Sequence, residues 1–151
     1  MSRPFFTVIL PTFNRPLELK RAVASILKQS FQDFEIIIVN NGQTPVADSF
    51  DDNRIRLLTE QRKGANYARN TGIENAGGEF ICFLDDDDEY LKNHLETFHQ
   101  LIIASNRVEA LYRTFTKIVS KNGRYTDPEV RLKAAGESAL EHLYTTVLVM
   151  H

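Results

Sequence analysis

Residues 80–89 read FICFLDDDDE, a short apolar run that passes directly into five consecutive acidic residues. The apolar part has the length and the β-branched and aromatic character of a strand buried on both faces, as in a parallel sheet. Open α/β sheets bind their ligands just beyond the carboxyl ends of such strands, which is where these carboxylates fall. Two unit charges about 6 Å apart repel by roughly 1–3 kcal/mol at effective dielectrics between water and a protein surface. A divalent cation, which prefers oxygen ligands, is the simplest explanation for the cluster.

An acidic helix start is the alternative interpretation of this cluster. Asp88 would be the N-cap, and Glu89 would be favoured by the helix dipole. This explanation covers these two residues but leaves Asp85, Asp86 and Asp87 unexplained.

Strand and helix patterns alternate outward from this stretch. Strands are predicted at 5–10, 34–39, 55–58, 80–84 and 110–119, the first stopped by Pro11 and the last followed by a turn at 121–123. One helix is predicted to start after Asn14-Arg15-Pro16, and a second covers about 64–75. The apolar face of the first helix is expected to contain Leu19, Val23, Ile26 and Leu27. That of the second helix is expected to contain the small residues Ala65, Ala68, Gly72 and Ala76. A third helix is expected with an apolar face of Leu91, Leu95, Phe98, Leu101 and Ile102. The alternation predicts an α/β fold, a mostly parallel sheet with helices on both faces.

The composition predicts one soluble domain. The chain has 151 residues, 42% of them hydrophobic, which is enough for a real core. A net charge of −2 lacks the basic excess that is typical of nucleic-acid-binding proteins. The single cysteine, Cys82, excludes a disulfide framework, and the sequence shows neither a signal peptide nor a transmembrane run. We therefore expect a cytoplasmic protein, with peripheral attachment to a membrane left open.

The end of the sequence suggests a truncated chain. It stops directly after the apolar residues 147–150, which predicts exposed apolar surface and self-association. The alternative is that these residues form a terminal strand.

Four polar segments follow the predicted strands, at 11–16, 40–42, 63–70 and 85–88. Since the carboxyl ends of parallel strands lie at one edge of a sheet, these segments should converge on one crevice. Each also has a simpler interpretation. Residues 11–16 and Asn41-Gly42 are compatible with ordinary turns, and Arg69 with a solvated helix surface.

Together the segments resemble the family 2 glycosyltransferases of GT-A (Rossmann-like) architecture. The resemblance is carried by VILPTFNR at 8–15, IIIVNNG at 36–42, ARNTGI at 68–73 and GGEFICFLDDDD at 77–88. These blocks have the family's order and spacing over residues 5–105. The resemblance implies a nucleotide-sugar-binding core at 1–105 and an incomplete start of the acceptor-side region at 106–151.

The resemblance also implies roles for individual residues. Asp87 would ligate Mn²⁺ or Mg²⁺, while Asp85 and Asp86 would contact the ribose or support the metal site. We expect Asp85 and Asp87 to project to the same side of an extended segment. The remaining implied nucleotide-sugar contacts are the ring of Phe13 on the nucleobase, backbone groups at Pro11 and Thr12, and Arg69 with Lys63 nearby.

One position departs from the family pattern. Where Asn40-Asn41 stand, family members commonly carry an aspartate that accepts the uracil N–H. An amide oxygen also accepts this bond, but the same side chain offers donors. Asn41 is therefore a candidate base contact. A UDP-sugar remains the expected donor, but asparagine at this position supports uridine less strongly than the aspartate would.

The implied activity is inverting, metal-dependent transfer from a nucleoside-diphosphate sugar to a glycan or lipid-linked acceptor hydroxyl, as in polysaccharide biosynthesis. Such transfer needs a general base. The downstream acidic and histidine residues match no family motif, so no base is assigned: Glu129, Glu137, Glu141 and His142. This chain alone is expected to be inactive. A sugar nucleotidyltransferase is disfavoured because residues 11–16 contain no glycine, whereas a non-catalytic nucleotide-sugar or divalent-ion binding module remains an alternative.

Overall fold

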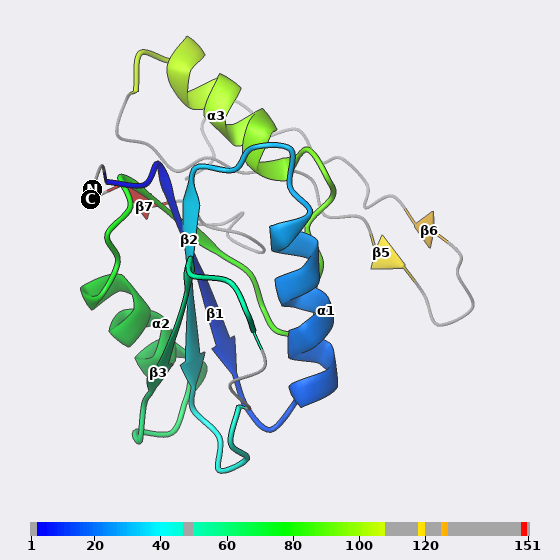
Figure 1. The fold of residues 1–151 in the computed structure, drawn as a ribbon, viewed down its shortest axis with the longest axis vertical. Coiled ribbons are helices and arrows are strands. Elements are labelled where there is room, and N and C mark those ends of the chain that lie inside the picture. Colours follow the sequence, from blue (N-terminus) through cyan, green and yellow to red (C-terminus); the bar gives the residue numbers. More distant parts are fainter. Residues whose placement is uncertain (1–2, 47–49, 108–117, 120–124, 127–148, 151) are drawn as a thin grey trace, which may run out of the picture.

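A computed structural model describes residues 3–46, 50–107, 118–119, 125–126 and 149–150 (Figure 1). The elements in chain order are β1 (Phe6–Thr12), α1 (Pro16–Leu27), β2 (Phe34–Asn40), β3 (Ile55–Thr59), α2 (Ala65–Glu74), β4 (Phe80–Phe83), α3 (His94–Ala104), β5 (Ile118–Val119), β6 (Tyr125–Thr126) and β7 (Val149–Met150). The predicted alternation of strands and helices is confirmed through α3. Most of the strand predicted at 110–119 and the turn at 121–123 lie outside the described residues.

The main sheet has the strand order β3-β2-β1-β4-β7. The first four strands are parallel, with Phe6 of β1 opposite both Phe34 of β2 and Phe80 of β4. β7 pairs antiparallel with β4, and β5 pairs antiparallel with β6 in a separate two-stranded sheet. The prediction of a mostly parallel sheet is therefore confirmed.

Helices cover both faces of this sheet, as predicted, with α1 and α2 on opposite sides of β1 (Figure 1). Alternate residues of a strand point to opposite faces, so Val8 packs under α1 and α3 while Ile9 packs under α2. The core on the α1 and α3 face includes Phe6, Val8, Leu10, Leu19, Val23, Ile26, Ile36, Ile38, Leu95, Phe98 and Ile102. Pro16 opens α1, where its missing N–H costs no hydrogen bond.

Small residues let α2 approach the sheet closely. A Cβ atom on Gly72 would lie 2.4 Å from Cγ2 of the buried Ile9, so only a glycine fits there. Ala68 is fully buried on the same face. Ala76 is half-buried, whereas Ala65 is exposed, so the predicted small-residue face is shorter than expected.

Two boundaries differ from the prediction. Pro11 does not stop the first strand, because β1 runs on to Thr12 with Pro11 opposite Val39 of β2. β4 pairs with β1 only as far as Ile9, so the proline lies where one edge of β1 is free of the ladder. The third helix starts at His94, and both Leu91 and Leu101 are exposed rather than part of its buried face.

The acidic residues also adopt a different local structure from the one expected. Asp88 N–H donates to Asp85 C=O at 3.0 Å, so residues 85–88 form a turn and not an extended segment. Asp88 is not a helix cap either, since the N-cap position of α3 is held by Asn93. Both errors have one cause: the turn at 85–88 inserts a loop of ten residues between β4 and α3.

None of the helices in the described part of the chain is long and apolar enough to cross a membrane.

Candidate active site

A pocket of about 510 Å³ lies at the carboxyl ends of β1, β2 and β4. It is lined by Pro11, Thr12, Phe13, Arg15, Asn41, Lys63, Gly64, Ala65, Arg69, Asp85, Asp86 and Asp87. Every site residue predicted from the sequence lies in this lining. The structure adds Arg15, Gly64 and Ala65, which border predicted site residues but carried no separate signal as site residues. The convergence of four distant segments on one crevice is thus observed.

Asp86 is the buried anchor of the pocket, with 6% of its surface exposed. Its Oδ2 accepts hydrogen bonds from Thr12 Oγ1 at 2.8 Å and from Phe13 N–H at 3.3 Å. Its Oδ1 accepts a third hydrogen bond from Arg15 Nη1 at 3.2 Å. Asp86 therefore fastens the loop after β1 to the turn after β4, and its oxygens are already used within the chain.

The two flanking carboxylates face the solvent and are each paired with an arginine. Asp87 Oδ2 lies 2.7 Å from Arg15 Nη1, and Asp85 Oδ1 lies 2.5 Å from Arg69 Nη2. The nearby Asp86 and then Asp87 raise the pKa of Arg15. The repulsion expected within the acidic run is thus offset by two guanidinium groups, one from Arg15 at the N-cap of α1 and one from Arg69 of α2.

The solvent-facing carboxylates of this pocket are of the chemical type that ligates divalent cations. Within the described ranges no group of three or more His, Cys, Asp or Glu side chains is arranged to hold a metal ion. Asp87 is half-exposed and borders the pocket, and carboxylate oxygens are the ligands that Mg²⁺ and Mn²⁺ prefer. Asp88 lies outside the lining, and burial followed by the charges of Asp87 and Asp85 raises its pKa.

The remaining walls are aromatic and basic. Phe13 is 53% exposed at the rim of the pocket, directly after the buried Pro11 and Thr12. Lys63, which precedes α2, and Arg69, within α2, add positive charge. Gly64, with φ of +132°, makes the turn into this helix in a backbone conformation that side-chain-bearing residues rarely adopt.

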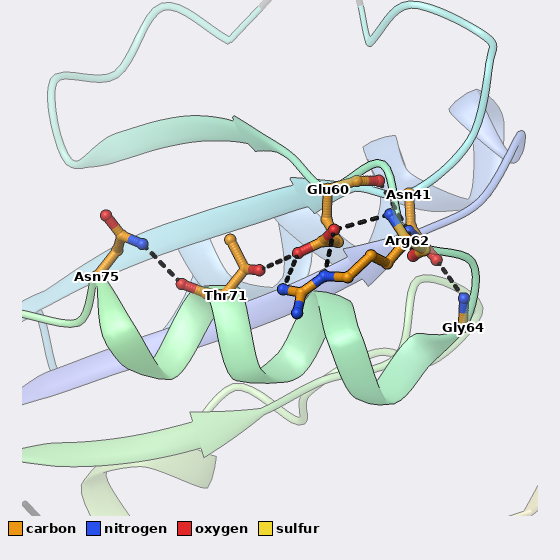
Figure 2. A network of polar contacts seen from close by, with 6 residues as sticks. All are labelled: Asn41, Glu60, Arg62, Gly64, Thr71 and Asn75. Carbon is orange, nitrogen blue, oxygen red and sulfur yellow. Dashed lines mark hydrogen bonds and ion pairs between the residues drawn. The ribbon is translucent and has the colours of Figure 1, made fainter.

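Asn41 directly follows β2 and lines the pocket, and Figure 2 shows its polar contacts. Its Nδ2 donates to the carbonyls of Glu60 at 2.8 Å and Arg62 at 2.6 Å. Its Oδ1 accepts the N–H of Gly64 at 2.9 Å. The side chain that was predicted to contact a base is thus hydrogen-bonded at both ends within the chain.

A mostly parallel α/β sheet with an acidic pocket at its carboxyl edge is the architecture of GT-A glycosyltransferases. Residues 7–130 match the family model described as glycosyl transferase family 2, and the chain belongs to this family.

Two curated relatives are glycosyltransferases. The GalNAc(5)-diNAcBac-PP-undecaprenol beta-1,3-glucosyltransferase of Campylobacter jejuni is 41% identical over 105 residues, which cover 64% of this chain and 34% of that protein. WfgD of Escherichia coli, a UDP-Glc:alpha-D-GlcNAc-diphosphoundecaprenol beta-1,3-glucosyltransferase, is 31% identical over 131 residues, which cover 82% of this chain and 51% of WfgD. The chain thus spans from a third to a half of the length of these two relatives.

Two solved structures share the fold. S. aureus TarS superposes with a TM-score of 0.76 at 22% identity, covering 97% of this chain and 28% of TarS. The mannosyltransferase PcManGT from Pyrobaculum calidifontis, in complex with GDP-Man and Mn²⁺, has a TM-score of 0.52 at 27% identity. That match covers 59% of this chain and 29% of PcManGT. The prediction of a GT-A fold is confirmed.

Proposed function

We propose that this chain is the donor-binding part of an inverting, metal-dependent glycosyltransferase that uses a nucleoside-diphosphate sugar. The observation that carries the proposal is the pocket at the carboxyl edge of the sheet, where an exposed aromatic side chain, three basic side chains and two solvent-facing carboxylates meet. Each of these groups suits one part of the donor.

The nucleotide would lie across the rim formed by the end of β1. The half-exposed ring of Phe13 offers an apolar face to a nucleobase, and base–aromatic stacking is worth about 1–3 kcal/mol. Pro11 and Thr12 would offer main-chain groups to the base. Arg69 and Lys63 would face the diphosphate, since both cations border the pocket.

Asp87 would hold the divalent cation, with Asp85 beside it at the ribose or the metal. The carboxylate of Asp87 is exposed to the pocket, whereas that of Asp86 is buried and satisfied by three hydrogen bonds. A bound Mn²⁺ or Mg²⁺ would offset negative charge on the departing nucleoside diphosphate. The Mn²⁺ in the PcManGT complex supports the use of a divalent cation.

The relatives suggest the chemistry of both substrates. The E. coli relative is named for a UDP-linked glucose donor, and both relatives are named for acceptors linked to undecaprenol through a diphosphate. We therefore propose a UDP-sugar as donor and a lipid-linked glycan as acceptor, in the assembly of a cell-surface polysaccharide at the cytoplasmic side of a membrane. Inversion requires a general base, and the candidates Glu129, Glu137, Glu141 and His142 lie outside the described residues.

A thermal-shift screen tests the proposal. UDP and GDP are added to the chain with Mn²⁺, with Mg²⁺, or with EDTA and no added metal. A nucleoside diphosphate at about a hundred times its Kd should add about 2.7 kcal/mol of stability, and only when the metal is present. The absence of a shift with every nucleotide in the presence of metal would contradict the proposal.

A further inference from the structure

The side chain of Asn41 makes a closed set of contacts to the loop of residues 60–64, here named the β3–α2 loop. Nδ2 meets two carbonyls of this loop and Oδ1 meets the N–H of Gly64 (Figure 2). The main chain of Asn41 is held in turn by β1, because its N–H donates to Thr12 C=O at 2.9 Å. Asn41 thus connects the end of the central strand to the loop that leads into α2.

This arrangement requires an amide at position 41. Two carbonyl oxygens need two N–H donors, and the N–H of Gly64 needs an acceptor. An ionised aspartate would meet only the last of these needs. It would place a negative oxygen where the carbonyls of Glu60 and Arg62 lie 2.8 and 2.6 Å from the present nitrogen.

Glu60, the first residue of the β3–α2 loop, binds Arg62 within the loop and Thr71 of α2 (Figure 2). One carboxylate oxygen, Oε1, accepts the N–H and the Nε of Arg62 at 2.8 and 3.0 Å. The other, Oε2, accepts Arg62 Nη2 at 2.7 Å and Thr71 Oγ1 at 2.6 Å. These hydrogen bonds hold the pKa of Glu60 well below its ordinary range, and those from the Arg62 side chain have the largest effect.

The contacts of Asn41 and Glu60 also affect the lining of the pocket. Lys63 and Gly64 follow the anchored residues directly, and with Ala65 they line the pocket. If the loop were flexible, binding of an anionic ligand by Lys63 would cost side-chain and backbone conformational entropy. Fixing the loop in advance removes part of this cost.

We propose that Asn41 is a positioning residue, which presents Lys63 and the Gly64 backbone to the donor diphosphate, rather than a residue that reads the nucleobase. This inference rests on the proposed function. The amide is used by the β3–α2 loop itself.

Two measurements on the 151-residue chain test this role. Titration calorimetry with UDP and Mn²⁺ should show at least a roughly tenfold loss of affinity in Asn41→Asp and in Asn41→Ala. Hydrogen exchange of the Gly64 amide, measured without UDP, should accelerate roughly tenfold in Asn41→Ala, which removes its acceptor, and much less in Asn41→Asp, whose carboxylate still accepts this N–H. The matched control is Asn75→Ala, which removes an amide bonded to Thr71 C=O at the far end of α2 and should leave both quantities unchanged.

A double-mutant cycle separates positioning from general damage to the fold. If Asn41 acts through Lys63, the loss of UDP affinity in Asn41→Ala combined with Lys63→Ala should be clearly smaller than the product of the single losses. Multiplicative losses would overturn the proposal, as would an Asn41→Asp variant that binds UDP as tightly as the wild type or more tightly. If the wild type binds no nucleoside diphosphate, the proposed function fails; the Gly64 exchange rates then decide alone whether Asn41 holds the loop.

Discussion

Asp86 Oδ2 accepts a hydrogen bond from Thr12 Oγ1 at 2.8 Å, joining two residues that are 74 positions apart in the sequence. Both residues are buried, and the same oxygen also accepts the N–H of Phe13. The end of β1 and the acidic turn after β4 are therefore one rigid unit. Asp87 follows Asp86 directly, so its position in the pocket depends on this link.

Replacing Asp86 by alanine should lower the free energy of unfolding by about 2–3 kcal/mol. The substitution leaves the buried Thr12 hydroxyl without its acceptor and removes a charged partner of Arg15, and hydrogen bonds to charged groups contribute about 1.5–3 kcal/mol. Urea denaturation measures the effect. Asp88→Ala is the control, since Asp88 lies outside the pocket and should cost far less. Equal losses in the two variants would contradict the anchoring role of Asp86.

Arg15→Gln should strengthen the binding of Mn²⁺ alone by about two- to fivefold. Arg15 Nη1 lies 2.7 Å from Asp87 Oδ2 and competes with a cation for that oxygen, and an exposed ion pair of this kind is weak. Electron paramagnetic resonance of free Mn²⁺ gives the affinity. Arg21→Gln, which removes a guanidinium 3.8 Å from Glu89, is the charge-matched control and should have a smaller effect. Weaker Mn²⁺ binding in Arg15→Gln would mean that Arg15 organises the site instead of competing for it.

Gly72→Ala should destabilise the chain by about 1–3 kcal/mol. The added methyl would lie 2.4 Å from the fully buried Ile9, and overpacking of this size outweighs the gain of about 1 kcal/mol in helix propensity. The exposed Asn70 of the same helix is the control, because Asn70→Ala changes propensity without a clash and should stabilise slightly. Thermal unfolding of both variants should therefore move in opposite directions, and a stabilising Gly72→Ala would show that α2 is not closely packed on β1.

His94 should make the fold sensitive to acid. Burial lowers the pKa of His94 from its ordinary 6.5 to about 4, where its ring stacks on Tyr90 at a centroid distance of 3.9 Å. Because the unfolded chain takes up this proton first, unfolding becomes easier as the pH falls from about 6.5 to about 4, by roughly 2–3 kcal/mol. Relative to the wild type, His94→Phe should gain stability over this pH range. A difference between the two proteins that does not change with pH would refute the assignment.

The sequence predicted the strands and the pocket well because both depend on local patterns. Apolar runs such as residues 34–39 define buried strands, and the parallel topology brings their carboxyl ends together whatever the loops do. Phe13, Arg69 and Asp85 were therefore expected in one crevice, and the structure places them there. The buried strands follow from hydrophobic periodicity, and the convergence of the site segments follows from their positions after these strands.

The details that the sequence did not predict depend on contacts across the fold. The turn at residues 85–88 forms where Asp86 bonds to Thr12 and Arg15, and no local sequence pattern predicts these hydrogen-bond partners. Pro11 was expected to end a strand, yet it is tolerated because β4 pairs with β1 only as far as Ile9. The bonds of Asn41 to the β3–α2 loop likewise join residues about twenty positions apart.

The most direct test of the central proposal is isothermal titration of UDP in the presence of Mn²⁺ against the wild type, Asp87→Asn and Asp88→Asn. Asp87 borders the pocket while Asp88 does not, so Asp87→Asn should abolish metal-dependent binding and Asp88→Asn should retain the wild-type affinity. Equal loss in the two variants, or full Mn²⁺-dependent binding by Asp87→Asn, would contradict the assignment of Asp87 as the ligand that holds the cation and the donor diphosphate.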